Sequence, residues 1–330
     1  MDRPAARTLA GVVAEKARTA PARPAILFDR RSITYAELVG HAEDAAKALL
    51  ALGIGNGDRI GVLLGNDPDW VILSLAASMV GAGFVPLNTW YKKSELAWTI
   101  RHCGLSLLIV APRFLKTDYA ALFGELIPEL GHARPGALRS REFPALRTII
   151  FLGDAPPGAM RHDDFLRQGR TVSDEALAGA AAAVDPDGNA FILYTSGSTA
   201  EPKGVLLNHR GVVENGFDLG RRRGIDSEDR VWLGSPLFYG LGATNPLPAT
   251  FTNGATLVLQ GHFDAGAAID IIHRTGASVY YGTGNMTRAI LDHPDYAQRK
   301  IRTLQKGNAG TMPEYKRLTL VEMARFRPMA

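Results

Sequence analysis

Short apolar segments with the length of a buried β-strand recur along this chain. Most of them are separated by a stretch long enough for a helix, with apolar residues at helical spacing. Strands that alternate with helices are joined by parallel crossovers, and the helices then cover both faces of the sheet. The chain is therefore predicted to adopt a layered α/β/α fold with parallel-rich sheets. The expected strands are Arg59–Leu64, Gly83–Leu87, Leu105–Val110, Leu146–Leu152, Ala190–Tyr194, Gly204–Leu207, Ala255–Leu259 and Ala277–Tyr281.

The first elements carry local signals of their own. Ala25–Phe28 and Ser32–Thr34 flank a polar turn, which predicts a short hairpin. Thr34 then begins a helix that extends to about Leu52, because Glu37 stands three residues later and completes a capping box.

Size and composition allow a large core. The chain has 330 residues, of which 46% are hydrophobic and 21% are charged, and this balance excludes an intrinsically disordered protein. Between Thr171 and Asn189 the sequence shifts to Ala, Gly, Asp and Pro, which is typical of a linker or a subdomain boundary. Two subdomains are therefore expected, residues 1–185 and 186–330. The single cysteine, Cys103, excludes an internal disulfide framework and favours a cytoplasmic location.

The charge balance is mild, with a formal net charge of +4. The densest basic cluster, Arg221–Arg223, precedes Gly224 and is interpreted as a solvated helix end, where cations are favoured by the helix dipole. Aromatic residues do not alternate with these arginines, so no nucleic-acid partner is expected.

One uncharged stretch, Trp70–Trp90, is long enough to cross a bilayer. Gly81 and Pro86 interrupt it where a spanning helix would have to continue. A buried helix over Asp69–Val80, followed by a core strand, explains the stretch, and no membrane span is expected.

The segment with the clearest chemistry is residues 194–204, which read Tyr-Thr-Ser-Gly-Ser-Thr-Ala-Glu-Pro-Lys-Gly. A buried strand leads into a loop of hydroxyl side chains, a glycine that permits unusual backbone angles, and a lysine. Hydroxyls, backbone N–H groups and an ammonium group converge on phosphate oxygens, so the loop is predicted to bind a polyphosphate. The order of Gly, Lys and Ser/Thr does not match a Walker A loop, and no Gly-x-Gly-x-x-Gly follows a strand.

This loop resembles the signature phosphate loop of the adenylate-forming superfamily, which includes acyl-CoA synthetases, luciferases and the adenylation domains of peptide synthetases. Further segments resemble other blocks of that family, and they occur in the family's order: Ile33–Leu38, Gly81–Asn88, Pro236–Gly242 and Gly307–Pro313. Ala200 departs from the family, which more often has glycine there.

The resemblance implies a ligase that activates a carboxylic acid with ATP and Mg²⁺ to an acyl-adenylate and transfers the acyl group to coenzyme A. It implies the fold of the family's large N-terminal domain. It assigns three groups of residues: for the β- and γ-phosphates Thr195, Ser196, Gly197, Ser198, Thr199 and Lys203; for the acyl pocket Phe238, Tyr239, Gly240 and Gly242; and beside the adenine Gly307, Ala309 and Gly310. Tyr281 and Met286 are further candidates for the acyl pocket, and the alternative is that they are simple core residues.

The acyl block also bears on the substrate. Domains of this family that activate amino acids carry an aspartate after the phenylalanine, whereas this chain has Tyr239 after Phe238. A fatty, aryl or alicyclic acid is therefore expected. Tyr239 is either a gate for the carboxylate or an ordinary core tyrosine, and both interpretations stay open.

Other polar residues are expected to have structural roles. His209 stands where the family commonly has a histidine at a helix start, and it is interpreted as a cap or as a residue that orients the loop. His162–Asp164 is interpreted as a solvated loop, because adjacent side chains point in different directions, and no metal site is expected. No Gly-x-Ser-x-Gly surrounds a serine, which argues against a hydrolase triad.

The family's magnesium glutamate, ribose aspartate, hinge and small domain with the catalytic lysine would all follow Ala330. The chain is therefore expected to be a fragment with little or no turnover, and its catalytic residues are unknown. A last helix is expected to begin at Pro313. The alternatives are a non-catalytic module that binds nucleotide or acyl groups and an unrelated P-loop phosphotransferase, which the Walker mismatch makes remote. Homo-oligomer formation is left open.

Overall fold

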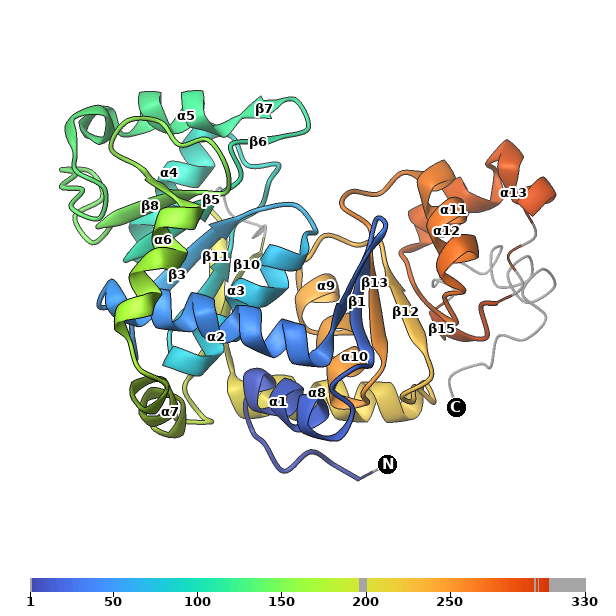
Figure 1. The fold of residues 1–330 in the computed structure, drawn as a ribbon. Coiled ribbons are helices and arrows are strands. Elements are labelled where there is room, and N and C mark those ends of the chain that lie inside the picture. Colours follow the sequence, from blue (N-terminus) through green and yellow to red (C-terminus); the bar gives the residue numbers. More distant parts are fainter. Residues whose placement is uncertain (1, 196–200, 300, 302, 309–330) are drawn as a thin grey trace. The chain divides into compact units, whose positions relative to one another are not determined.

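The structure is a computed structural model, and it describes residues 2–195, 201–299, 301 and 303–308 (Figure 1). The chain forms two compact units. The first contains residues 1–38, 66–68 and 212–330, and the second contains residues 39–65 and 69–211. This division is discontinuous along the chain, whereas the sequence placed one boundary near residue 185; the two subdomains expected from the sequence stay a prediction.

The second unit is built on a seven-stranded sheet with the order β11-β10-β4-β3-β5-β8-β9. All neighbours pair in parallel except β10 and β11, which form an antiparallel hairpin. The strands are β3 (Arg59–Leu63), β4 (Gly83–Pro86), β5 (Leu107–Val110), β8 (Thr148–Phe151), β9 (Met160–Arg161), β10 (Asn189–Thr195) and β11 (Lys203–Asn208). A small separate ribbon is formed by β6 (Arg113–Phe114) and β7 (Thr117–Asp118).

Helices cover both faces of this sheet. Side chains alternate between the two faces along each strand, so the contacts of neighbouring strand residues show which helices lie on each face. On one face, Val85 and Ile192 pack with residues of α4 and α5 in a buried cluster. On the other face, Trp70 of α3 meets Phe84 edge-on at 4.9 Å and stacks on Phe191 at 6.2 Å between ring centroids. The helices are α2 (Tyr35–Ala51), α3 (Pro68–Val80), α4 (Lys93–Cys103), α5 (Tyr119–Leu126), α6 (His162–Gln168) and α7 (Asp174–Ala182), with 3-10 turns η1 (Pro128–His132) and η2 (Gly169–Thr171).

The first unit is built on a six-stranded sheet with the order β15-β14-β12-β13-β1-β2. Only the predicted hairpin of β1 and β2 is antiparallel. The strands are β1 (Pro24–Phe28), β2 (Arg31–Thr34), β12 (Arg230–Leu233), β13 (Thr256–Leu259), β14 (Val279–Tyr281) and β15 (Lys306–Asn308). The helices are α1 (Leu9–Thr19), α8 (His209–Arg222), α9 (Gly240–Ala243), α10 (Pro246–Thr252), α11 (Ala265–Thr275), α12 (Gly284–Leu291) and α13 (Pro294–Arg299).

This sheet is also covered on both faces. Trp232 and Tyr280 stack at 5.0 Å between centroids and pack with residues of α11 and α12. The alternate strand residues Val231, Val279 and Tyr281 pack with α8 and α10. Two sheets with helices on both sides confirm the predicted layered, parallel-rich α/β fold.

Several local predictions are confirmed. The capping box before α2 is present, since the Thr34 amide donates to the Glu37 carboxylate at 2.8 Å and the Glu37 amide donates to the Thr34 hydroxyl at 3.2 Å. The uncharged stretch from residue 70 to 90 contains α3 and β4. Among the described residues, none of the helices has the length and apolar character needed to span a membrane.

Two local predictions are wrong, and one cannot be compared. Residues 171–189, interpreted as a linker or a subdomain boundary, are not a plain linker, because they contain α7, which begins where the Ser173 hydroxyl accepts a hydrogen bond from the Ala176 amide. Alanine is the strongest helix former, so the alanines there favour a helix over a linker. His162–Asp164, interpreted as a loop, forms the first turn of α6, where two acids are favoured by the helix dipole. The helix expected from Pro313 lies outside the described residues.

Candidate functional site

The predicted phosphate loop leaves the seven-stranded sheet at the carboxyl end of β10. Because β10 is parallel to β4, this end lies at the same edge as the carboxyl ends of β4, β3, β5 and β8. Ligands of open α/β sheets bind at that edge. Thr195 and Lys203 pair with each other at the end of the hairpin, and both are exposed. Ser196, Gly197, Ser198 and Thr199 lie outside the described residues.

His209 begins α8 directly after the hairpin. Its side chain is 2% exposed, and burial lowers its pKa to about 4, so the imidazole is neutral near pH 7. Its Nδ1 has no hydrogen-bond partner among the residues that the structure describes. The cap of α8 is instead the neighbouring Asn208, whose Oδ1 accepts from the Gly211 amide at 2.7 Å. The suggestion that His209 itself caps the helix is therefore wrong.

The predicted acyl block lies in the first unit, between β12 and α10. Phe238 and Tyr239 are in contact, with ring centroids 4.6 Å apart, and Tyr239 precedes α9. Gly242 is required by close packing, because a Cβ there would lie 2.3 Å from the backbone oxygen of Pro236. Met286, at the start of α12, joins this block through its sulfur, which lies 3.8 Å from the Ser235 hydroxyl.

Asn66 organises this block, and sequence reasoning missed it. Its side-chain amide donates to the backbone oxygens of Ser235 and Gln260, both at 3.0 Å, and its Oδ1 accepts from the Leu237 amide at 2.8 Å. The side chain is buried, and these three bonds use most of its hydrogen-bonding capacity. The one available signal was a polar residue shortly after a buried strand, separated from β3 by Leu64 and Gly65.

Tyr281 has surroundings different from those of Phe238. Its ring is 2% exposed and packs in the buried cluster under α8 and α10, where the guanidinium of Arg223 lies 3.9 Å from the ring centroid. Arg221 and Arg222 are exposed at the end of α8 as expected, but Arg223 is not solvated in the same way. The assignment of Tyr281 to the acyl pocket stays a prediction.

On the predicted adenine side, only Gly307 is described. It lies in the edge strand β15 with a φ of 129°, and a Cβ there would lie 2.1 Å from the backbone oxygen of Tyr280. Glycine is therefore required by the approach of the two strands. Ala309 and Gly310 lie outside the described residues.

The residues of the chain match the family described as AMP-binding enzyme over positions 13–325. The chain belongs to the AMP-binding enzyme family. It is 32% identical over 310 residues to the mitochondrial medium-chain acyl-CoA ligase ACSF2 of Macaca fascicularis, covering 91% of this chain and 50% of that protein.

Solved structures of AMP-binding enzymes share the fold. An anthranilate CoA ligase in complex with anthranoyl-AMP has a TM-score of 0.75 and 23% identity, covering 90% of this chain and 54% of that one. A fatty acyl CoA synthetase of Mycobacterium tuberculosis has a TM-score of 0.74 and 21% identity, covering 96% and 58%. The chain spans about half the length of the curated relatives it matches.

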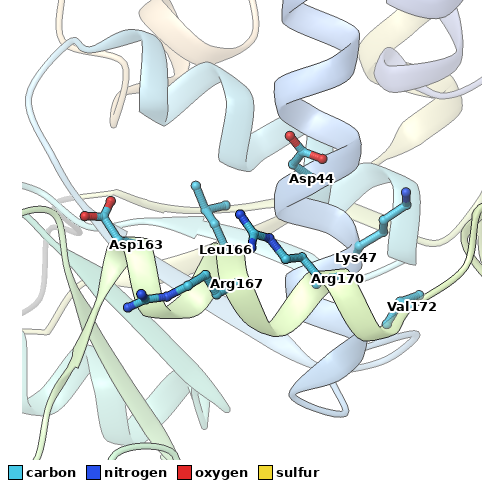
Figure 2. Close-up of a pocket in the computed structure, with 8 residues that line it drawn as sticks. Asp44, Lys47, Asp163, Leu166, Arg167, Arg170 and Val172 are labelled. Carbon is cyan, nitrogen blue, oxygen red and sulfur yellow. The ribbon is translucent and has the colours of Figure 1, made fainter.

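A polar cavity of the second unit contains none of the residues that the AMP-binding resemblance assigns (Figure 2). It has a volume of about 610 Å³ and lies between α2 and the α6–η2 segment. Its lining combines acids with cations, of which Lys47 is already paired with Asp174 at 2.5 Å. The lining residues are Asp44, Lys47, Asp163, Leu166, Arg167, Gly169, Arg170 and Val172. Within the described ranges, no three His, Cys, Asp or Glu side chains are grouped so as to hold a metal ion.

Proposed function

We propose that this chain is the nucleotide-binding part of an acyl-CoA synthetase, which activates a carboxylic acid with ATP and transfers it to the thiol of coenzyme A. The observation that carries this proposal is the β10–β11 hairpin, with Thr195 and Lys203 at the carboxyl edge of a parallel sheet inside the AMP-binding match. The relatives named above as acyl-CoA ligases support it.

In the proposed first step, a carboxylate oxygen of the acid bonds to the α-phosphorus of ATP while the bond from that phosphorus to the pyrophosphate oxygen breaks. The loop from Thr195 to Lys203 would hold the β- and γ-phosphates, and Lys203 would offset the charge that builds up on the leaving pyrophosphate. In the second step, the thiol sulfur of coenzyme A attacks the acyl carbon and AMP leaves with its phosphate oxygen.

Mg²⁺ would neutralise part of the charge on the phosphates in such a reaction. Such an ion is usually held by one or two carboxylates together with the phosphates themselves, and the described residues contain no cluster of three or more His, Cys, Asp or Glu side chains that would hold it alone. No step is therefore assigned to it here.

The acid is proposed to be fatty, aryl or alicyclic. Phe238, Tyr239 and Met286 would line its pocket with apolar surface, while Gly240 and Gly242 leave space beside them. Tyr239 stands where an aspartate would pair with a substrate ammonium group, so an amino acid is not favoured. A cytoplasmic location is part of the same proposal and depends on the single cysteine of the sequence.

Calorimetric titration of the 330-residue chain with ATP and Mg²⁺ tests the proposal. Lys203→Ala should weaken binding by about tenfold or more, because a charge-assisted hydrogen bond contributes roughly 1.5–3 kcal/mol. The matched control is Lys116→Ala, an exposed lysine in the turn between β6 and β7, which should leave ATP affinity unchanged. Equal affinities in the two variants would exclude the loop as the nucleotide site.

A carboxylate-dependent assay of pyrophosphate release separates the ligase from a non-catalytic module. Release that depends on an added fatty or aryl acid, and that falls in Lys203→Ala, supports the ligase. ATP binding without pyrophosphate release in the presence of any of the acids contradicts ligase activity in this chain and supports a non-catalytic binding module.

A further inference from the structure

Tyr194 is the residue before the first loop residue, Thr195, and its ring packs against α4. Its hydroxyl lies 2.8 Å from Nδ1 of His102, a residue 92 positions away in the chain. The imidazole of His102 stacks on the indole of Trp98, with ring centroids 4.3 Å apart and an interplanar angle of 14°. Trp98 also meets the ring of Tyr194 edge-on at 6.0 Å.

Burial completes the environment of the phenol. Cys103, next to His102 on α4, lies in the same buried cluster as Tyr194. Tyr194 is 7% exposed and Cys103 is 3% exposed, and burial raises the pKa of both groups. The phenol therefore stays neutral near pH 7, and its hydroxyl has the imidazole of His102 as its hydrogen-bond partner.

The ring of Tyr194 also touches the strand that leaves the loop. Tyr194 pairs with Gly204 across the hairpin, and a Cβ at Gly204 would lie 3.3 Å from Cζ and 3.5 Å from the hydroxyl of Tyr194. The glycine after Lys203 thus leaves room for this ring. Tyr194 is therefore the backbone neighbour of Thr195, and its buried ring lies against Gly204, the residue that follows Lys203.

We propose that Tyr194, held by His102 and Trp98, is a positioning residue that fixes Thr195 and Lys203 for phosphate binding; this rests on the proposed function. The strand pairing alone leaves the end of an exposed edge hairpin free to twist or fray. Anchoring the ring to α4 restricts that motion, so less ordering remains to be done when nucleotide binds.

Tyr194→Phe tests this, because it keeps the ring and removes only the hydroxyl. ATP affinity measured by calorimetry should fall by about two- to tenfold, the range for one neutral hydrogen bond. The matched control is Tyr35→Phe in the first unit, where a buried phenol donates to the backbone oxygen of Ala255 at 2.7 Å. It loses a comparable hydrogen bond and should keep wild-type ATP affinity.

Variants of His102 test the same hydrogen bond from its other partner, and one of them should restore it. His102→Leu should lose ATP affinity to the same extent as Tyr194→Phe, whereas His102→Asn, whose side-chain oxygen reaches about the place of Nδ1, should keep most of it. The double variant Tyr194→Phe/His102→Leu should bind no more weakly than the weaker single variant, since both remove one interaction. Additive losses, or equal affinity of Tyr194→Phe and Tyr35→Phe, would overturn the proposal.

Failure of the proposed function has a different signature. If the wild-type chain binds no ATP and Lys203→Ala changes nothing, the nucleotide site is wrong, and amide hydrogen exchange then tests the positioning separately. Faster exchange at the amides of Thr195 and Lys203 in Tyr194→Phe, but not in Tyr35→Phe, shows that the cluster holds the hairpin end. Unchanged exchange refutes it.

Discussion

Asp229 and Arg223 are both charged residues with buried side-chain atoms in the first unit, but they differ in the hydrogen bonds that these atoms form. The carboxylate of Asp229 accepts from Lys306 at 2.6 Å, from the Ser278 hydroxyl at 2.7 Å and from the Asp226 amide at 2.8 Å. The guanidinium of Arg223 lies over the ring of Tyr281, but its Nε and Nη1 have no hydrogen-bond partner within the described part of the chain. The hydroxyl of Tyr281 is likewise without one there.

Asp229 therefore has a structural role in joining strands, whereas no such role follows from the surroundings of Arg223. Three strands meet at Asp229, since it precedes β12, Ser278 precedes β14 and Lys306 begins β15. A buried charge that is paired and accepts three hydrogen bonds is costly to break, whereas a buried charge without partners costs free energy as it stands. His209 is a third case, because burial lowers its pKa and it avoids the cost by staying neutral.

The largest effect is expected from Asp229→Ala, which leaves the Lys306 ammonium, only 15% exposed, with the exposed carboxylate of Asp226 at 3.3 Å as its remaining acidic partner. The free energy of unfolding, measured by urea denaturation, should fall by about 3–5 kcal/mol. The control Glu125→Ala breaks the exposed pair with Lys93 and should cost less than about 1 kcal/mol. Similar losses in the two variants would show that burial adds nothing to the Asp229 site.

A smaller effect is expected from acidification through His209. The pKa of about 4 in the folded chain lies below the ordinary value of 6.5, so the unfolded chain binds a proton that the folded chain does not between these values. Stability should therefore fall as the pH drops from 6.5 to 4, by at most about 3 kcal/mol from this group. The measurement is urea denaturation at several pH values. His209→Gln should show a shallower fall over that range, and an unchanged slope would mean that His209 is protonated in the folded chain.

The smallest effect is expected from Arg223→Met. Methionine keeps an unbranched apolar side chain over Tyr281 and removes the unpaired charge, so the free energy of unfolding should stay the same or rise by about 1 kcal/mol. Arg223→Ala also removes the packing over the ring and should be less stable than Arg223→Met in the same denaturation experiment. A loss of several kcal/mol in Arg223→Met would mean that the guanidinium has a partner and belongs with Asp229.

The sequence was sufficient where the signal is local. The capping box of Thr34 and Glu37 spans four residues, and the alternation of apolar strands with helices predicted a parallel-rich α/β architecture covered on both faces, although not the division into two large sheets. The linker interpretation failed although a local signal existed, because Ser173 followed by an alanine-rich segment is typical of a capped helix.

The rest depends on pairs of residues that are distant in the chain. The partners of Asn66 are 169 to 194 positions away, and Tyr194 meets His102 across 92 positions. No spacing rule connects such residues, since their meeting depends on the order of strands in the sheet. Gly204 is similar: the sequence marks it as part of a phosphate loop, whereas the space it leaves for the ring of Tyr194 is visible only in the folded chain.

The hairpin of β1 and β2 has a consequence for the order in which the protein can fold during its synthesis. Its sheet neighbour is β13, where Ile26 pairs with Leu257. At about 5–20 residues per second, the ribosome needs roughly 10–45 s to reach β13 after completing β2. The residues of the second unit are all synthesised within that interval. The hairpin therefore has no β13 to pair with during that interval, and an unpaired sheet edge of this kind is a site where other chains can associate.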